Sequence, residues 1–176
     1  IVAPLTFAAF GGHLAIVDYM LQHGANVNVG LSVDYTPLRA ACVRGYLEVA
    51  QLLVARGAEK VETFKRAAVE ACKWSNLSML EWMKSEGHDF AESDYKGKYP
   101  TMGAIRGGKL ENLKFLVKLG VPVKRFRSVT PVHYAITAGH LDMVKFLIEE
   151  CGQTLTPQTQ PTFFHHSDEI PDSVKE

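Results

Sequence analysis

The chain has 176 residues, enough for one domain or one short array, and its 47% hydrophobic content is typical of a folded protein. Nineteen basic residues balance nineteen acidic ones, which disfavours a generally basic nucleic-acid binder. No uncharged apolar run approaches the roughly 18–20 residues that span a membrane, and three cysteines without framework spacing argue against a disulfide scaffold. We therefore expect an intracellular, cytoplasmic protein.

The first segment, IVAPLTFAAFGGHLAIVDYMLQHGANVNV, predicts two consecutive helices. Pro4 suits the first position of a helix, which Gly12 ends, and Leu14 opens a second, more apolar helix. The chain starts without Met and already inside this pattern, so we expect a fragment of a longer protein or a processed chain.

The second segment, YTPLRAACVRGYLEVAQLLVARGA, repeats the arrangement over residues 35–58. Thr36 is the predicted N-cap, Pro37 the first helical residue and Gly45 the turn that ends this helix. A second helix then carries apolar residues at helical spacing and stops at Gly57.

The third segment, FKRAAVEACKWSNLSMLEWMKSEG, is irregular. It lacks the Thr-Pro pair, it has Ser75-Asn76 where the other segments have glycine followed by a longer residue, and its preceding loop is three residues short. In the fourth segment Asn112 is polar in a column that is otherwise apolar. We therefore expect an irregular middle.

The fourth and fifth segments complete a periodic series. A proline lies eight residues before a glycine at Pro4, Pro37, Pro100 and Pro131. The leucines that open the second helices are Leu14, Leu47, Leu77, Leu110 and Leu141, with gaps of 33, 30, 33 and 31 residues. Self-similarity at this period indicates a repeat array.

Aligned columns in the second helices predict one buried face and one solvated face. The apolar column reads Met20, Leu53, Met83, Leu116 and Leu147. The polar column reads Asp18, Gln51, Glu81, Lys114 and Lys145. Helices of about ten residues are unstable alone, so each pair must bury its apolar face on its neighbours, and stacking supplies the core.

The Thr-Pro-Leu and Gly-x-Leu patterns, with the GANVN ending of the first segment, resemble ankyrin repeats. The resemblance implies an all-α solenoid of stacked helix–turn–helix pairs with short loop or hairpin fingers. It covers residues 1–156, as five repeats at about 1–30, 31–60, 61–93, 94–124 and 125–156. Residues 157–176, rich in Pro, Thr and Gln, are expected to form an extended or disordered tail.

Candidate catalytic and metal-binding residues have simpler structural interpretations. His13, His133 and His140 occupy positions that recur with the fold, and Cys42 and Cys72 lie in equivalent positions about one helix spacing apart, too far for a disulfide. The pair His165-His166 has no further ligand at metal spacing. We predict no enzyme activity, no metal and no cofactor.

The resemblance implies that a partner protein contacts the exposed side of the first helices and the fingers. The predicted partner-binding residues are Tyr35, Arg44, Lys73, Trp74, Tyr95, Lys96, Lys98, Arg106, Phe126 and Arg127, with Lys65 and Arg125 as further basic finger residues. Basic and aromatic side chains alternate in this set, and no acidic residue occupies a predicted contact position. We expect an acidic, extended protein segment as the ligand, centred on Trp74 and Arg106.

The alternatives stay open at this point. The chain could be a structural subunit held permanently in a large assembly through its end faces and tail, or a regulatory segment of a longer protein. A solvated basic face without a ligand is the plainest alternative, and nucleic acid is disfavoured by the neutral net charge. In the tail, Phe163 and Phe164 are predicted to dock on the array or on a partner.

Overall fold

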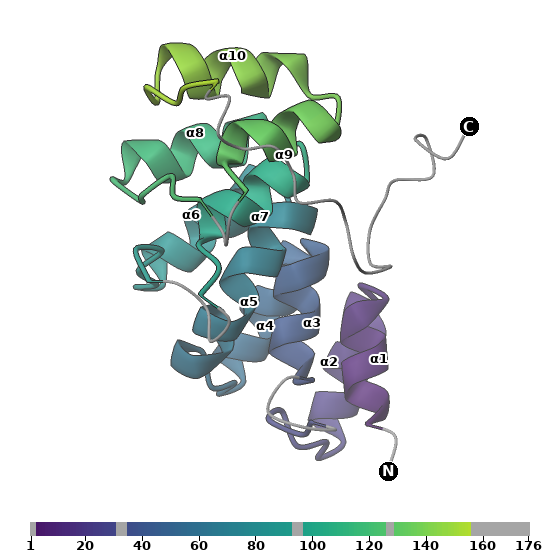
Figure 1. The fold of residues 1–176 in the computed structure, drawn as a ribbon. Helices are drawn as coiled ribbons and strands as arrows, with labels where there is room; N and C mark the ends of the chain where they lie inside the picture. The colour runs from purple at the N-terminus through teal and green to yellow at the C-terminus, as the bar shows by residue number, and fades with distance from the viewer. Residues whose placement is uncertain (1–2, 31–34, 93–96, 126–128, 156–176) are drawn as a thin grey trace, which may run out of the picture.

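The computed structural model describes residues 3–30, 35–92, 97–125 and 129–155. Within these ranges the chain forms ten helices in five antiparallel pairs, which confirms the predicted all-helical solenoid (Figure 1). The first helices of the pairs are α1 (Pro4–Phe10), α3 (Pro37–Arg44), α5 (Val61–Trp74), α7 (Pro100–Arg106) and α9 (Pro131–Thr137). The second helices are α2 (Leu14–Gln22), α4 (Leu47–Ala55), α6 (Leu77–Ser85), α8 (Leu110–Lys118) and α10 (Leu141–Glu149).

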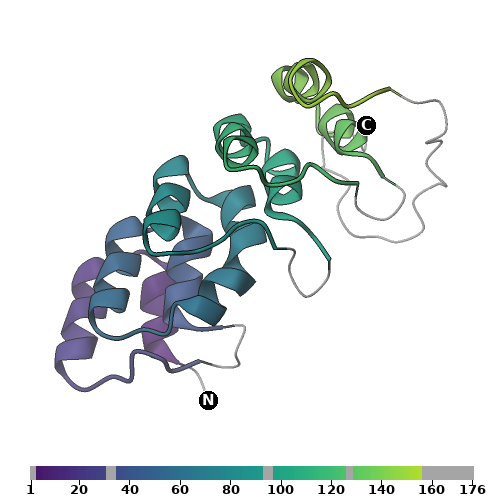
Figure 2. The ribbon, with the colours of Figure 1, turned by 90° about the vertical axis from the view of Figure 1, so that its left-hand side faces the viewer.

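The pairs stack along one direction, with α1 and α2 at one end and α9 and α10 at the other (Figure 2). Each first helix packs on the next first helix, from α1 through α9, and the second helices from α2 through α8 do the same. The stack is therefore two layers of helices with a continuous core between them. The apolar column supports this arrangement, since Leu53, Met83, Leu116 and Leu147 are fully buried, whereas Met20 in the first repeat is partly buried.

The ends of the regular helices follow the expected local chemistry. The Thr36 hydroxyl accepts a hydrogen bond from the Arg39 N–H (3.2 Å) as the N-cap of α3, and Thr130 caps α9 in the same way. Gly45 ends α3 with a positive φ of 78°, and the following N–H donates to the Ala41 carbonyl. The equivalent N–H closes α1, α7 and α9.

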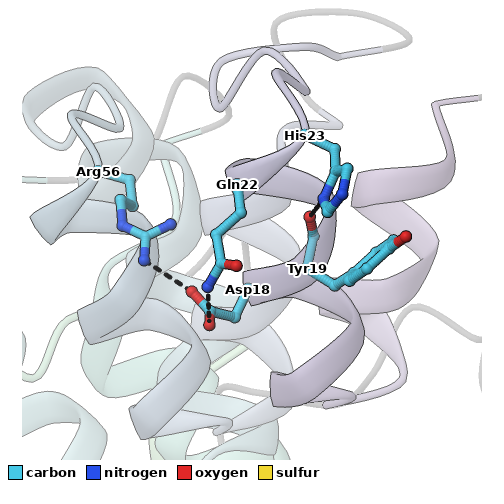
Figure 3. Close-up of polar contacts among 5 residues, drawn as sticks. All are labelled: Asp18, Tyr19, Gln22, His23 and Arg56. Carbon is cyan, nitrogen blue, oxygen red and sulfur yellow. Dashed lines mark hydrogen bonds and ion pairs between the residues drawn. The ribbon is translucent and has the colours of Figure 1, made fainter.

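Polar contacts also tie neighbouring repeats together on the side of the second helices. Arg56 after α4 forms a 2.7 Å ion pair with Asp18 on α2, and Gln22 donates to the same carboxylate (Figure 3). The Asn28 side chain donates to the Gly57 carbonyl and accepts from the Glu59 N–H. The segment after α2 is thus anchored to the turn after α4.

The third repeat is irregular, as predicted, and the structure supplies the reason. Helix α5 has 14 residues, against 7 or 8 in the other first helices, because residues that precede the first helix elsewhere are helical here. Lys65, predicted to lie in a finger, is instead inside α5; that prediction was wrong. The short loop before this repeat leaves no room for a finger, and the chain continues as helix.

Polar side chains replace the missing glycine at the end of α5. Ser75 occupies the glycine position with a φ of −88°, and its hydroxyl donates to the Ala71 carbonyl (2.7 Å), which also accepts from the Ser75 N–H. In the other repeats the N–H of the residue after the glycine donates to the equivalent carbonyl. Asn112 on α8 is buried and donates to the carbonyls of Cys72 and Ser75 at 3.1 and 3.2 Å. Ser75 and Asn112, the two departures from the repeat pattern, therefore compensate together for the missing glycine after α5.

Candidate protein-interaction surface

A row of basic side chains runs across the ends of three adjacent first helices. Arg44 is the last residue of α3, Lys73 lies in the last turn of α5, and Arg106 is the last residue of α7. Because α3 packs on α5 and α5 on α7, these three positions follow one another along the stack. We call Arg44, Lys73 and Arg106, together with Lys98 just before α7, the cationic row.

Three of these cations lie over aromatic rings. The Arg44 guanidinium carbon is 4.8 Å from the centre of the Phe10 ring in the preceding repeat, and that of Arg106 is 5.8 Å from the Tyr134 ring in the following repeat. The Lys73 ammonium lies 4.3 Å from the ring of its neighbour Trp74. Such contacts contribute about 0.5–1 kcal/mol at exposed sites, and they hold the cations in place without neutralising them.

Two other members of the row, Arg106 and Lys98, act electrostatically on Lys73. Partial burial lowers the pKa of the Lys73 ammonium, the charges of Arg106 and Lys98 lower it further, and Glu70 opposes them. The cations of α7 and of the segment before α7 are therefore each close enough to repel the Lys73 ammonium. An anionic group placed among them would relieve this repulsion.

Acidic residues also lie on α5, the helix that carries Lys73. The carboxylate of Glu70 pairs with Arg39 of α3, and Glu62 pairs with Arg66 at 2.7 Å on α5 itself. Each of these acids is matched by a neighbouring base outside the cationic row. These ion pairs lie beside the row, and the charge of Glu70 also acts on Lys73.

The other predicted partner-binding residues have varied positions. Trp74 and Tyr35 are 58% and 59% exposed, and Tyr35 lies beneath Arg39 with its ring centre 5.9 Å from the guanidinium carbon. Tyr95, Lys96, Phe126 and Arg127 lie outside the described residues, as do Phe163 and Phe164. The structure adds Tyr134 to this surface, because its ring lies beneath Arg106. The sequence signal for it was an aromatic residue at the repeat position that Phe7 occupies in the first repeat.

The histidines and cysteines considered above have structural surroundings. The Nδ1 atom of the His133 ring lies 2.7 Å from the hydroxyl oxygen of the capping residue Thr130. Cys42 and Cys72 are fully buried, free thiols, and burial raises the pKa of each well above its ordinary value. Within the described residues no group of three His, Cys, Asp or Glu side chains could hold a metal ion, and no helix is long and apolar enough to cross a membrane.

A groove of about 340 Å³ lies between α5 and the segment after α6, at the place where a finger would precede a regular third repeat. Two ion pairs cross it, Lys60–Glu86 at 2.6 Å and Lys65–Glu92 at 2.9 Å. The sequence signal for this groove was the short spacing of 30 residues between Leu47 and Leu77. These two ion pairs hold the segment after α6 against α5.

His88 lies beside this groove, edge-on to Phe64 and Phe90 at centroid distances of 6.0 and 4.6 Å. Burial lowers the pKa of its imidazole to about 4; Lys84 also lowers it, while Asp89 and Glu92 partly oppose the shift. In the unfolded chain this pKa is about 6.5. Between these values the unfolded state binds a proton that the folded state does not.

We therefore expect the contribution of His88 to stability to be fully present above pH 6.5 and to fall as the pH drops toward 4. The expected loss is about 1–3 kcal/mol, the full linkage value discounted for the ring's partial exposure. Urea unfolding at pH 7 and pH 4.5 measures it, and His88→Phe should be less sensitive to acid than the natural chain. Substitution of the exposed His23 by Phe is the control, and an equal acid response in all three chains would contradict the assignment.

These features define a stacked helix-pair repeat protein with a basic and aromatic surface on its first helices. The family described as "Ankyrin repeats (3 copies)" matches residues 2–63 and 68–159, and the chain belongs to this family. Ankyrin repeats are protein–protein interaction modules, and the repeat domain is generally non-catalytic.

Curated relatives carry a similar segment inside much longer proteins. "Ankyrin repeat and KH domain-containing protein mask-1" of Caenorhabditis elegans is 28% identical over 156 residues, covering 85% of this chain and 6% of that protein. "E3 ubiquitin-protein ligase XBAT33" of Arabidopsis thaliana is 28% identical over 84% of this chain and 29% of its own length. The human "Transient receptor potential cation channel subfamily A member 1" is 24% identical over 85% of this chain and 15% of its own length.

Proposed function

We propose that this chain is a non-catalytic, intracellular module that binds an acidic, extended segment of a partner protein on the cationic row. The observation that carries the proposal is the succession of Arg44, Lys73 and Arg106 at the ends of the stacked helices α3, α5 and α7. An extended segment fits because the row follows the stacking direction across α3, α5 and α7. Carboxylates spaced along such a segment would meet one repeat after another.

The aromatic side chains give this surface an apolar component. Trp74 is exposed beside Lys73, and Phe10 and Tyr134 lie under the outer two cations of the row. Aromatic and arginine side chains are enriched among the residues that dominate binding energy. The partner segment is therefore expected to combine acidic residues with apolar ones, and its charge should govern chiefly the association rate.

The test is charge reversal at Arg44 and Arg106 together, with a dye-labelled oligo-glutamate peptide as the probe. Binding measured by fluorescence anisotropy at low salt should weaken by about tenfold or more, and the difference should shrink as salt screens the charges. Lys84→Glu with Lys118→Glu is the matched control, because it makes the same change in net charge in the last turns of α6 and α8.

Equal weakening by the two double variants would mean that only net charge matters, and the cationic row would lose its role. Binding of the natural chain to oligo-lysine as tight as to oligo-glutamate would also overturn the proposal. Tighter binding of single-stranded DNA than of an oligo-glutamate peptide of equal charge would identify nucleic acid as the ligand of this surface.

A second candidate function follows from the relatives, in which the similar segment occupies 6–29% of the protein. In this alternative the module regulates a longer protein of which it is a part, and its acidic ligand is another segment of that protein. Comparing oligo-glutamate binding by the isolated chain and by the full-length protein separates the two. Intramolecular occupancy of the row should weaken binding in the full-length protein only.

A further inference from the structure

A candidate ligand for the cationic row is present in the chain itself. Residues 163–176 have the sequence FFHHSDEIPDSVKE and lie outside the described residues. Four acidic residues stand against one lysine in this segment, and two adjacent phenylalanines precede the acids. We call residues 163–176 the acidic segment. Its composition is the one expected above for the ligand of the row, acidic residues combined with apolar ones.

The spacing of the acids suits a surface that is built from repeats. Asp168, Asp172 and Glu176 are each four residues apart, and Pro171 between them disfavours a helix. Four residues of extended chain span at most roughly 14 Å, and neighbouring helices lie roughly 8–10 Å apart. A nearly extended segment can therefore present one carboxylate to each successive repeat.

The cationic row offers one cation per repeat in the same way. Arg106, Lys73 and Arg44 lie in the last turns of α7, α5 and α3, and these helices pack side by side (Figure 1). The junction between α5 and α7 is close, because a Cβ added at Gly107 would lie 2.2 Å from the Lys73 carbonyl oxygen. The three cations thus follow one another at the spacing of the stacked helices.

The acidic segment can also reach the row. The Gln153 side chain donates to the Val123 carbonyl (3.4 Å), so the chain leaves the fifth repeat beside the segment that follows α8. Thirteen residues lead from Leu155 to Asp168, a reach of at most roughly 45 Å. The second repeat lies three helix spacings from the fifth, roughly 30 Å. The acids can therefore reach every repeat that contributes to the row.

The order of residues along the chain fits the same direction. The phenylalanines come first, so they would lie toward the near end of the row, where the Tyr134 ring lies beneath Arg106. The exposed Trp74 follows in the direction of the second repeat. The acids come later and would lie along the cations.

We propose that the acidic segment binds the cationic row of its own chain, running from the fifth repeat toward the second, and competes there with the partner segment. This proposal rests on the proposed function of the row. A short tether raises the effective concentration of a ligand to roughly the millimolar range, which favours this segment over a free one of similar composition. A partner must displace it, so the measured affinity for a partner is lower than that of the open row.

The first test is neutralisation of the acids in the otherwise natural chain. Binding of the dye-labelled oligo-glutamate peptide at low salt should tighten by about tenfold, because the tethered competitor is weakened. The variant is Asp168→Asn, Glu169→Gln, Asp172→Asn and Glu176→Gln. The control neutralises four exposed acids of the second helices and makes the same change in net charge: Glu48→Gln, Glu81→Gln, Asp142→Asn and Glu149→Gln. It should have a much smaller effect.

A second variant tests the segment without a change in charge. Phe163→Ala with Phe164→Ala removes the apolar side chains that would pack near Tyr134, and it should also tighten peptide binding severalfold. Unchanged binding in this variant would show that the phenylalanines take no part in the contact and would contradict the proposed direction.

The contact itself can be detected by zero-length carbodiimide cross-linking, which joins a carboxylate to a lysine amine. Peptide mass spectrometry of the monomer fraction should find a carboxylate of the acidic segment linked to Lys73 or Lys98. The yield should fall at high salt and should not depend on protein concentration. Such links found only in dimers would show binding between chains and would overturn the proposal.

The outcomes also separate this proposal from the proposed function. Equal tightening by the neutralised segment and by its control would mean that only net charge matters, and the acidic segment would lose its role. Oligo-glutamate binding by the natural chain that still depends on Arg44 and Arg106 would then leave the function of the row intact. If the chain with the neutralised segment does not bind oligo-glutamate at all, the proposed function fails together with this proposal.

Discussion

Substitution of Gly103 by alanine is expected to lower the free energy of unfolding by about 3 kcal/mol, the upper end of the range for overpacking. Gly103 lies inside α7 where this helix crosses α5, and both helices are buried there. An added Cβ would overlap the carbonyl oxygen of Val69 and also meet the Cys72 side chain at 3.4 Å. The obstacle is backbone, which cannot rotate away, so the two helices must separate.

Urea unfolding of the Gly103→Ala chain measures this loss as a lower midpoint. The matched control is Ala40→Gly, the reverse change at the equivalent position of α3, which should cost only the helix propensity of about 1 kcal/mol. Because alanine is the better helix former, stabilisation by Gly103→Ala would show that α5 and α7 do not approach closely. A measured increase in the free energy of unfolding would therefore contradict the prediction.

Substitution of Asn112 by methionine is expected to cost about 2–3 kcal/mol, although methionine occupies this register in two other repeats. The Asn112 amide is the donor to the carbonyls of Cys72 and Ser75 at the end of α5, and both bonds are buried. Methionine would restore the apolar column and leave these carbonyls without that donor. The polar residue is therefore required by its position opposite Ser75.

The coupling between the two positions can be measured with a double-mutant cycle in urea. In a Ser75→Gly background the chain can adopt the positive φ that Gly45 adopts, and the following N–H can then close α5 as it closes the other first helices. Asn112→Met should cost about 1 kcal/mol less in that background than in the natural chain. Strictly additive effects would mean that Ser75 and Asn112 are independent departures.

Much of the fold could be predicted because the repeat pattern records local and nearest-neighbour requirements. Thr36 caps α3, Gly45 ends it and Leu53 is buried, all as the pattern indicates. These features depend on the residue type at one position and on packing against an adjacent repeat that has the same residue pattern. The equivalent positions of Cys42 and Cys72 predicted that they are too far apart for a disulfide, and both are free thiols.

The candidate site was predicted only in part. Arg44, Lys73 and Arg106 were placed on the same surface, and Trp74 is exposed beside them. The ion pair between Arg39 and Glu70 was not anticipated, because it joins residues 31 positions apart whose side chains meet only when α3 and α5 stack. The roles assigned to the cationic row remain predictions until binding is measured.

The sequence by itself determined the helix-pair repeat, its period, its caps and its buried columns, because these follow from residue types within one repeat and from periodicity along the chain. Only the tertiary structure showed why Asn112 is tolerated in an apolar column and how α5 ends without glycine. It also showed that Ile16 and Ile136, which occupy buried registers, face solvent. The physical reason is that hydrogen-bond satisfaction and burial are set by groups distant in sequence, and at the ends of a stack those groups belong to no residue that the structure describes.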